Sequence, residues 1–359
     1  MTTKQSAHPY LVQLRKQAKE LKKEKGFPKL TEAQFELAKS LGFPSWPKLV
    51  LSVQQKDLVN SIREGDLESF KLILSETPKL ASVPFEDGST PMLLAAENDD
   101  PMMISLLHEA GGSLRDRLAD SAHTPLSWAI TSWAFHAAVR LIELGDKPDL
   151  FCAAGLGSVD LLKQFWPEGK LVLNPSQTGS SRFDAEGNRL PRPPESDIDQ
   201  VSDALYIACR CGRTEAARWL LDHGADPNWR GYAGATNLGW AEFTNNRELC
   251  ELVRSRGADD TILDATFRAT PRAFGMMVQV GWNFPMWKTK MRLEQDPTLA
   301  NVRGEWGTLL HAAVDAGNVE SVELILACGA DRTALNEQGQ TATEFARSVG
   351  KNDIADMIG

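Results

Sequence analysis

The chain has 359 residues, of which 42% are hydrophobic and 24% are charged, and its formal net charge is −9 at pH 7. No apolar run approaches the roughly 20 residues that a membrane-spanning helix needs, and no apolar segment follows the basic N-terminal residues, so neither a membrane span nor a signal peptide is predicted. The five cysteines lack the spacing of a disulfide framework, which predicts free thiols and a cytoplasmic location.

The charge is unevenly distributed along the chain. Residues 1–56 hold 11 Lys/Arg against 4 Asp/Glu, a balance of +7, whereas the remaining residues hold 28 against 44, a balance of −16. An acidic body argues against binding to a phosphate backbone. The basic segment leaves nucleic acid or an acidic protein open as a partner of the N-terminal head alone.

Residues 1–56 are predicted to form a basic helical cap. The first predicted helix has apolar residues at helical spacing, namely Leu11, Leu14, Ala18 and Leu21. Ser45 is predicted to cap a later helix that has Trp46 and Pro47 in its first turn. This helix is mainly apolar, whereas a DNA-recognition helix needs Arg, Lys, Asn or Gln aimed at base edges. We therefore expect the head to cover the open end of a helical stack rather than to bind nucleic acid.

Pairs of short helices are predicted over residues 57–166. Thr90-Pro91 and Thr124-Pro125 stand 34 residues apart, and each is predicted to open a helix. Proline loses no hydrogen bond at the first helical position, and the threonine hydroxyl can cap free backbone amides. The last pair in this block, which begins at Asp149, is shortened.

Residues 167–200 interrupt the pattern and are predicted to be a loop insertion, because Pro, Gly, Ser and Thr are frequent there. Loops of this length are uncommon inside a compact fold and are usually functional or disordered. Three alternatives remain open for the insertion, which contains Arg182. The first is that it folds over a groove as a lid, the second is that it becomes ordered only when a partner binds, and the third is that it stays unstructured.

Sequence repeats are clearest in residues 201–359. A four-residue phrase recurs as His223-Gly224-Ala225-Asp226, Arg256-Gly257-Ala258-Asp259 and Cys328-Gly329-Ala330-Asp331. The first two copies lie 33 residues apart, and the segment from Gly307 to Ala313 reads Gly-Thr-Leu-Leu-His-Ala-Ala. Residues 261–306 are degenerate and carry large apolar residues where a regular unit is expected.

A period of about 33 residues with these signatures resembles the ankyrin repeat. The resemblance covers most of residues 57–359, and the head resembles a leader found on many bacterial ankyrin-repeat proteins. It implies an all-α ankyrin-repeat solenoid of roughly eight helix pairs, with an N-terminal helical cap, a mid-array loop insertion and a bacterial source. It also implies non-covalent binding of a partner, usually another protein.

In ankyrin units, the residue before the first inner-helix alanine and those two and three after it face the concave groove. These positions include Glu97, Trp128, Arg210, Trp240, Phe243 and Asp315. The loops between helix pairs add Trp229 and Tyr232, and the insertion adds Arg182. Because exposed Trp, Tyr and Arg dominate binding hot spots, these nine residues form the predicted partner-binding set.

The leading hypothesis is a non-catalytic protein that engages a protein partner through this groove. The alternative is a small-molecule binder or enzyme whose pocket lies between the groove and the 167–200 insertion. Glu97 or Asp315 would then act as acid or base, and Arg210 would hold an anion. General acid–base catalysis needs a positioned pair in a water-poor pocket, which an open groove does not supply, so the pattern favours the first hypothesis.

No metal site or cofactor is predicted. Cys209 and Cys211 lack the further ligands that a zinc site requires, and we interpret them as buried helix residues. His311 is interpreted as the histidine of the repeat signature, which supports the neighbouring turn in ankyrin units.

Overall fold

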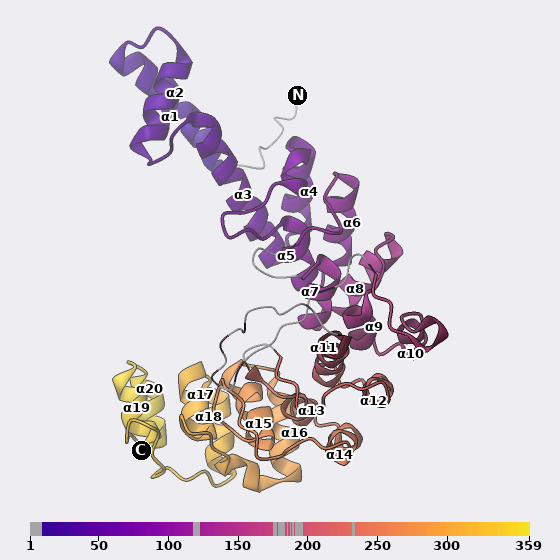
Figure 1. Ribbon diagram of the computed structural model, residues 1–359. Coiled ribbons are helices and arrows are strands. Elements are labelled where there is room, and N and C mark those ends of the chain that lie inside the picture. The colour runs from indigo at the N-terminus through magenta and orange to yellow at the C-terminus, as the bar shows by residue number, and fades with distance from the viewer. Residues whose placement is uncertain are drawn as a thin grey trace. The chain divides into compact units, whose positions relative to one another are not determined.

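The computed structural model describes residues 9–117, 123–174, 178, 184, 186, 188, 190, 197–231 and 234–359 (Figure 1). These residues form helices joined by turns, and the strand pairing within them is limited to isolated bridges. The predicted all-α class is therefore confirmed. The chain divides into two compact units, Met1–Pro148 (unit 1) and Asp149–Gly359 (unit 2). Among the described helices, none is long and apolar enough to cross a membrane.

The head of unit 1 consists of α1 (Pro9–Lys25), α2 (Leu30–Ser40) and the first part of α3 (Trp46–Glu64). Its core is formed by Leu11, Leu14, Ala38 and Leu49. Helix α3 begins at Trp46 as predicted, although the Ser45 side chain makes no capping hydrogen bond. The proposed boundary at residue 56 falls inside α3, whose later residues Leu58 and Ile62 are fully buried. The head and the first repeat thus share one continuous helix.

The repeats of unit 1 follow from α3. They pair α3 with α4 (Leu67–Glu76), α5 (Pro91–Glu97) with α6 (Pro101–Glu109), and α7 (Pro125–Thr131) with α8 (Phe135–Glu143), and the short helix η1 (Pro78–Ser82) follows α4. Thr90 accepts a hydrogen bond from the Leu93 amide. Thr124 and Ser127 cap each other's backbone reciprocally. Both helix starts predicted from Thr-Pro are therefore confirmed.

Unit 2 continues with further helix pairs. These are α9 (Leu150–Leu156) with α10 (Val159–Lys163), α11 (Asp197–Arg210) with α12 (Thr214–Asp222), α13 (Asn237–Thr244) with α14 (Arg247–Ser255), α15 (Pro271–Gly281) with α16 (Met286–Gln295), α17 (Leu309–Ala316) with α18 (Val319–Ala327), and α19 (Ala342–Ser348) with α20 (Asn352–Ile358). The short helices η2 (Pro167–Gly169) and η4 (Pro297–Asn301) follow α10 and α16. The helix pair from Asp149, which the sequence places in the first block, belongs to unit 2.

The insertion is shorter than predicted, because α11 begins at Asp197 rather than near residue 201. One of its described residues, Thr178, is buried. Its amide and hydroxyl each donate a 2.5 Å hydrogen bond to Asp149, the residue that also caps α9 by accepting from the Cys152 amide. Arg182 lies outside the described residues, so the three alternatives for the insertion stay predictions.

The degenerate segment 261–306 forms a helix pair, α15 and α16. Three of its large apolar residues, Phe274, Met276 and Met277, are buried in the core, whereas Trp282 and Trp287 are exposed. Helix α15 packs closely on α13 through Gly275. A Cβ atom at this position would lie 2.8 Å from the Phe243 backbone nitrogen, so only glycine permits this approach.

Tight loops, called fingers, precede the inner helices α5, α15 and α17 at residues 84–89, 264–269 and 303–308. His311 connects two neighbouring repeats beside such loops. It is fully buried; its Nδ1 contacts the Thr308 hydroxyl at 2.8 Å, and its Nε2 lies 3.1 Å from the Gln340 carbonyl oxygen. The interpretation of His311 as a structural histidine is confirmed.

Candidate partner-binding cleft

The structure divides the predicted partner-binding residues into groups. Glu97 and Trp128 line a cleft of unit 1, and Asp315 lines a cleft of unit 2. Four others are buried in unit 2, namely Arg210, Trp229, Trp240 and Phe243. The remaining two, Arg182 and Tyr232, lie outside the described residues.

The expectation that Trp240, Phe243 and Arg210 are exposed in the groove is wrong. Trp240 is 1% exposed, and its ring centroid lies 5.4 Å from that of Phe243 and 5.3 Å from that of Phe274. The Arg210 guanidinium lies over the Trp240 ring, 4.1 Å from its centroid. Helices α11 and α15 pack on either side of α13, so their side chains cover these positions. A role of the three residues in binding stays a prediction, and here they belong to the core.

Trp229 is also buried rather than displayed at a loop tip. Its indole Nε1 donates to a carboxylate oxygen of Asp203 at 3.4 Å. The next residue, Arg230, donates from Nη1 to the carbonyls of Gly234 and Leu263 at 3.0 and 2.7 Å. These bonds turn the loop side chains towards the array, which explains why Trp229 departs from the expected exposure.

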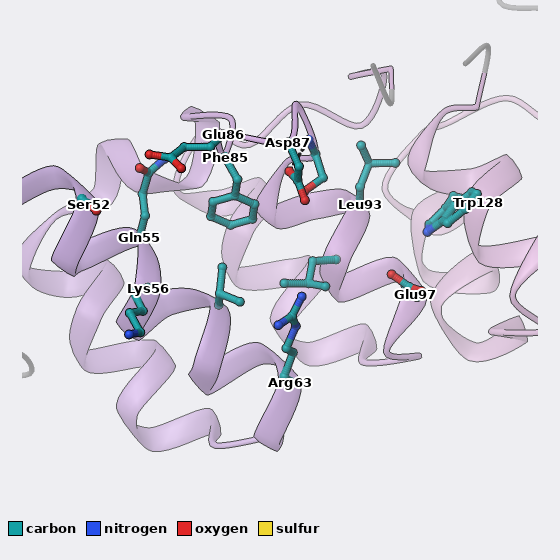
Figure 2. A pocket seen from close by; sticks show the side chains of 13 residues that line it. Ser52, Gln55, Lys56, Arg63, Phe85, Glu86, Asp87, Leu93, Glu97 and Trp128 are labelled. Atoms are coloured by element: carbon teal, nitrogen blue, oxygen red, sulfur yellow. Dashed lines mark hydrogen bonds between the residues drawn. The ribbon is translucent and has the colours of Figure 1, made fainter. Parts of the chain in front are cut away.

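The cleft of unit 1, called the Trp128 cleft below, has a volume of about 490 Å³ (Figure 2). It is formed by α3, the finger 84–89, α5 and α7. Figure 2 shows Lys56 at one end of the cleft, Trp128 at the other, and Asp87 and Arg63 between them. The cleft thus runs across successive inner helices of the unit.

Apolar side chains form one part of the lining of the Trp128 cleft. The apolar and aromatic lining residues are Val59, Phe85, Leu93, Leu94 and Trp128. Trp128 is half-buried, and its ring makes an edge-on contact with His123 at a centroid distance of 5.6 Å. The Thr124 cap fixes the start of α7, which places Trp128 one turn into the helix. The cleft therefore offers an aromatic surface whose position is set by the repeat.

Charged side chains also line the cleft. They are Lys56 and Arg63 from α3, Glu86 and Asp87 from the finger, and Glu97 from α5. All five are exposed. Within the described part of the chain, none of Lys56, Arg63 and Glu97 makes an ion pair. Their charges are therefore available to a partner.

The finger of the cleft is held in place at both ends. Asp87 accepts hydrogen bonds from the amide and hydroxyl of Ser89 at 2.9 and 2.6 Å. These bonds, and to a smaller extent the positive charge of Arg63, lower the pKa of Asp87, so it is ionised at neutral pH. The Gln55 amide donates to the Pro84 carbonyl at 2.8 Å, which fastens the finger to α3.

The candidate catalytic residues are not brought together in either cleft. Glu97 belongs to unit 1 and Asp315 to unit 2, and both are exposed. Among the described residues, no group of three or more His, Cys, Asp or Glu side chains could hold a metal ion. Burial raises the pKa of Cys211 to about 12 and that of Cys209 further, so both thiols are protonated and unreactive at neutral pH.

Comparisons with known proteins agree with the repeat pattern. Residues 150–264 match the family model for ankyrin repeats (3 copies), and residues 307–337 match that for a single ankyrin repeat. The chain therefore contains ankyrin repeats. Its fold is accordingly the predicted all-α ankyrin solenoid.

Two curated relatives share parts of this array. The putative palmitoyltransferase ZDHHC13 of Danio rerio is 26% identical over 167 residues, which cover 45% of this chain and 25% of that protein. The human ankyrin repeat and SOCS box protein 6 is 31% identical over 147 residues, which cover 39% of this chain and 34% of that protein. The chain thus spans about a quarter to a third of the length of these relatives.

Two solved structures are similar to the chain. The complex of the predatory endopeptidase Bd0816 from Bdellovibrio bacteriovorus with immunity protein Bd3460 contains a chain that is 20% identical, with a TM-score of 0.37, covering 59% of this chain and 97% of that one. The human ASB11 ankyrin repeat domain is 14% identical, with a TM-score of 0.30, covering 84% of this chain and 97% of that domain.

Sequence reasoning missed the contributions of α3 and the first finger to the ankyrin groove. Lys56 and Arg63 were overlooked because the inner helix of the first repeat carries no Thr-Pro signature. A signal for the finger was present, since Asp87-Gly88 is a turn dipeptide separated only by Ser89 from the helix cap Thr90. Reading this turn as a finger would have brought Phe85 and Asp87 into the predicted site.

Proposed function

We propose that the chain is a non-catalytic ankyrin-repeat protein that binds a protein partner in the Trp128 cleft of unit 1. The observation that carries this proposal is the half-buried Trp128 at the end of a cleft that combines apolar side chains with charges that have no ion-pair partner among the described residues. Binding hot spots are typically aromatic residues in pockets surrounded by polar groups that exclude water. The repeats of this family generally mediate protein–protein interaction, which agrees with such a use.

The lining of the cleft indicates which partner segment would fit. Leu93, Leu94 and Trp128 favour an apolar or aromatic side chain, because burying it removes apolar surface from water. Arg63 and Glu97 carry opposite charges and favour a segment with both an acidic and a basic group. The proposed partner is therefore a protein segment with an apolar anchor flanked by charges of both signs.

The experiment compares three tagged proteins as bait in the native host: the unmodified chain, Trp128→Ala and Trp287→Ala. Trp287 is 62% exposed on α16 of unit 2, so its replacement is a matched loss of an exposed tryptophan outside the cleft. We expect a protein that is retained by the unmodified chain and by Trp287→Ala but lost from Trp128→Ala. With that protein purified, calorimetry should show that Trp128→Ala weakens binding about tenfold or more.

Circular dichroism of each bait controls for folding. If all three folded proteins retain the same partners with equal affinity, the Trp128 cleft is not the binding surface. A further pair of variants, Arg63→Glu and Glu97→Arg, tests the charge argument. Each should weaken binding on its own, and the loss should become smaller as salt is raised, because exposed charges are screened.

A further inference from the structure

A second cleft lies in unit 2, with a volume of about 620 Å³, and is called the Trp306 cleft below. Four aromatic residues line it, namely Phe267, Trp282, Trp306 and Phe345. The lining also contains Asp315, from the end of α17, and Asp315 is the one charged side chain among the described residues that line this cleft. Its chemistry therefore differs from that of the Trp128 cleft, whose rim carries both signs.

The backbone positions the aromatic walls of the Trp306 cleft. The rings of Trp306 and Phe345 meet edge-on, with centroids 5.8 Å apart and planes at 90°. The finger 303–308, which carries Trp306, packs on the finger 264–269, which carries Phe267, through a bridge between Gly304 and Ala269. A Cβ at Gly304 would lie 1.9 Å from the Phe267 carbonyl oxygen, so this approach requires glycine. The packing of the two fingers therefore positions Trp306 and Phe267, two of the four aromatic residues.

Asp315 makes no ion pair with another described residue. The ammonium of Lys351 lies beside it and donates to the main-chain carbonyls of Val314 and Asp315 at 2.8 and 2.5 Å. On the fingers, Arg268 pairs with Glu305, and Arg303 donates to the Leu335 carbonyl at 3.4 Å. The Asp315 side chain thus lines the cleft beside four aromatic residues.

We propose that the Trp306 cleft binds the guanidinium group of an arginine side chain on a protein partner. Aromatic faces attract cations through the ring quadrupole, and a carboxylate at the same site adds a direct charge pair. The planar guanidinium both stacks on aromatic rings and pairs with a carboxylate through two parallel hydrogen bonds, which an ammonium cannot do. A neutral or anionic group would lack this electrostatic gain.

The charge of the surrounding unit also favours a cationic segment. Residues 149–359 hold 21 Lys/Arg and 29 Asp/Glu, so their formal balance is 21 − 29 = −8. A basic segment of a partner is attracted to such a surface, and the attraction weakens with salt. This site belongs to another unit than the Trp128 cleft, and it can be present or absent independently of the function proposed above.

The test uses the full chain and two acetyl- and amide-capped pentapeptides, Gly-Gly-Arg-Gly-Gly and the same sequence with citrulline in place of arginine. Citrulline keeps the shape of the side chain but is neutral. Binding is followed by nuclear magnetic resonance of the tryptophan indole N–H groups during titration into the millimolar range. We expect the arginine peptide to bind about tenfold more tightly than the citrulline peptide.

Three variants locate the effect. Asp315→Asn should reduce the preference for arginine to about twofold, and Trp306→Leu should weaken binding of the arginine peptide about tenfold. Glu323→Gln, the matched loss of an exposed carboxylate on α18 outside both clefts, should change neither the arginine preference nor the affinity for the arginine peptide. Phe345→Leu replaces a second wall of the cleft and should weaken binding as well, in case Trp306→Leu unfolds the last repeats.

Four results would overturn the proposal. They are equal binding of the two peptides, no binding of either at millimolar concentration, an undiminished arginine preference in Asp315→Asn, and binding of methylguanidinium as tight as that of the arginine peptide. The last result would show a small-cation site instead of a peptide site. None of them bears on partner retention by the Trp128→Ala bait, so failure here and failure of the proposed function are distinguishable.

Discussion

Trp128 and Trp240 occupy equivalent positions in their repeats but have different surroundings. Each lies four residues after the threonine that caps its helix, Thr124 or Thr236, and each precedes an alanine. Trp128 is half-buried and lines a cleft, whereas Trp240 is 1% exposed. The repeat position alone therefore does not decide whether a tryptophan is available to a partner.

The neighbouring helices account for the difference. Helix α7, which carries Trp128, packs on α5, and both have 7 residues. Helix α13, which carries Trp240, packs between α11 with 14 residues and α15 with 11. These longer helices bring Arg210 and Phe274 against the indole ring. Exposure in this array is consequently a property of adjacent repeats rather than of the repeat itself.

The most direct test of the difference between Trp128 and Trp240 is to replace each tryptophan in turn. Trp240→Ala should destabilise unit 2 by about 3–5 kcal/mol, because it leaves a cavity in a packed aromatic core. Trp128→Ala should cost unit 1 roughly 1 kcal/mol, because part of its ring is already in water. Urea unfolding followed by circular dichroism measures both. Equal losses in the two variants would contradict the assignment of one tryptophan to the core and the other to a surface.

A second test contrasts a buried with an exposed finger carboxylate. Burial raises the pKa of Asp264 in unit 2 to about 6, against 3.8 for a free side chain. The native state then holds a proton that the unfolded state has lost, so the contribution of Asp264 to stability declines as pH rises from about 4 to 6, by up to roughly 3 kcal/mol. Asp264→Asn should therefore become more stable relative to the unmodified chain over this range.

For Asp87, in the exposed finger of unit 1, the pKa shift has the opposite sign. Its pKa is lowered by hydrogen bonds from Ser89, so its contribution is present above the unfolded pKa and is lost as pH falls through the lower folded pKa. Because Asp87 is exposed, Asp87→Asn should change stability by less than about 0.5 kcal/mol at any pH. Urea unfolding at pH 4, 5, 6 and 7 tests both variants. If the difference in the free energy of unfolding between Asp264→Asn and the unmodified chain does not change with pH, the burial argument is contradicted.

A smaller substitution tests how closely α13 and α15 pack around Trp240. Gly275→Ala places a Cβ 2.8 Å from the Phe243 backbone nitrogen and should cost about 1–3 kcal/mol by forcing the helices apart. Gly281→Ala in the same helix places a Cβ 3.3 Å from the Phe267 ring and should change stability by less than about 0.5 kcal/mol. Thermal unfolding of the two variants measures both effects. If Gly275→Ala is as stable as the unmodified chain, the contact between α13 and α15 is looser than the structure shows.

The features that sequence predicted well depend on local interactions. Helices start at Pro91 and Pro125 because Thr90 and Thr124 cap amides a few residues away. His311 contacts Thr308 within its own repeat signature. Such contacts recur wherever the motif recurs, which is why a single sequence reveals them.

The features that sequence reasoning missed depend on residues far along the chain. Burial of Trp240 requires Phe274, and the helix pair in the degenerate segment requires Gly275 to approach α13. Of the candidate site, Trp128 and Glu97 were found through the repeat register, whereas Lys56 and Arg63 were not. The register locates a residue on an inner helix, but the neighbouring repeats decide what covers it.

Helix α3 has a mechanical consequence for the head. Its 19 residues form one element of about 28 Å that begins among α1 and α2 and ends in the first repeat. Because this helix is continuous, we expect α1 and α2 to move together with the first repeat as one rigid body instead of rotating about a flexible joint. The fluorescence anisotropy of a fluorophore on exposed Val12 should accordingly decay as slowly as that of a fluorophore on the repeats. Cleavage after residue 56 would cut α3 within the helix and break the rigid connection between the head and the first repeat.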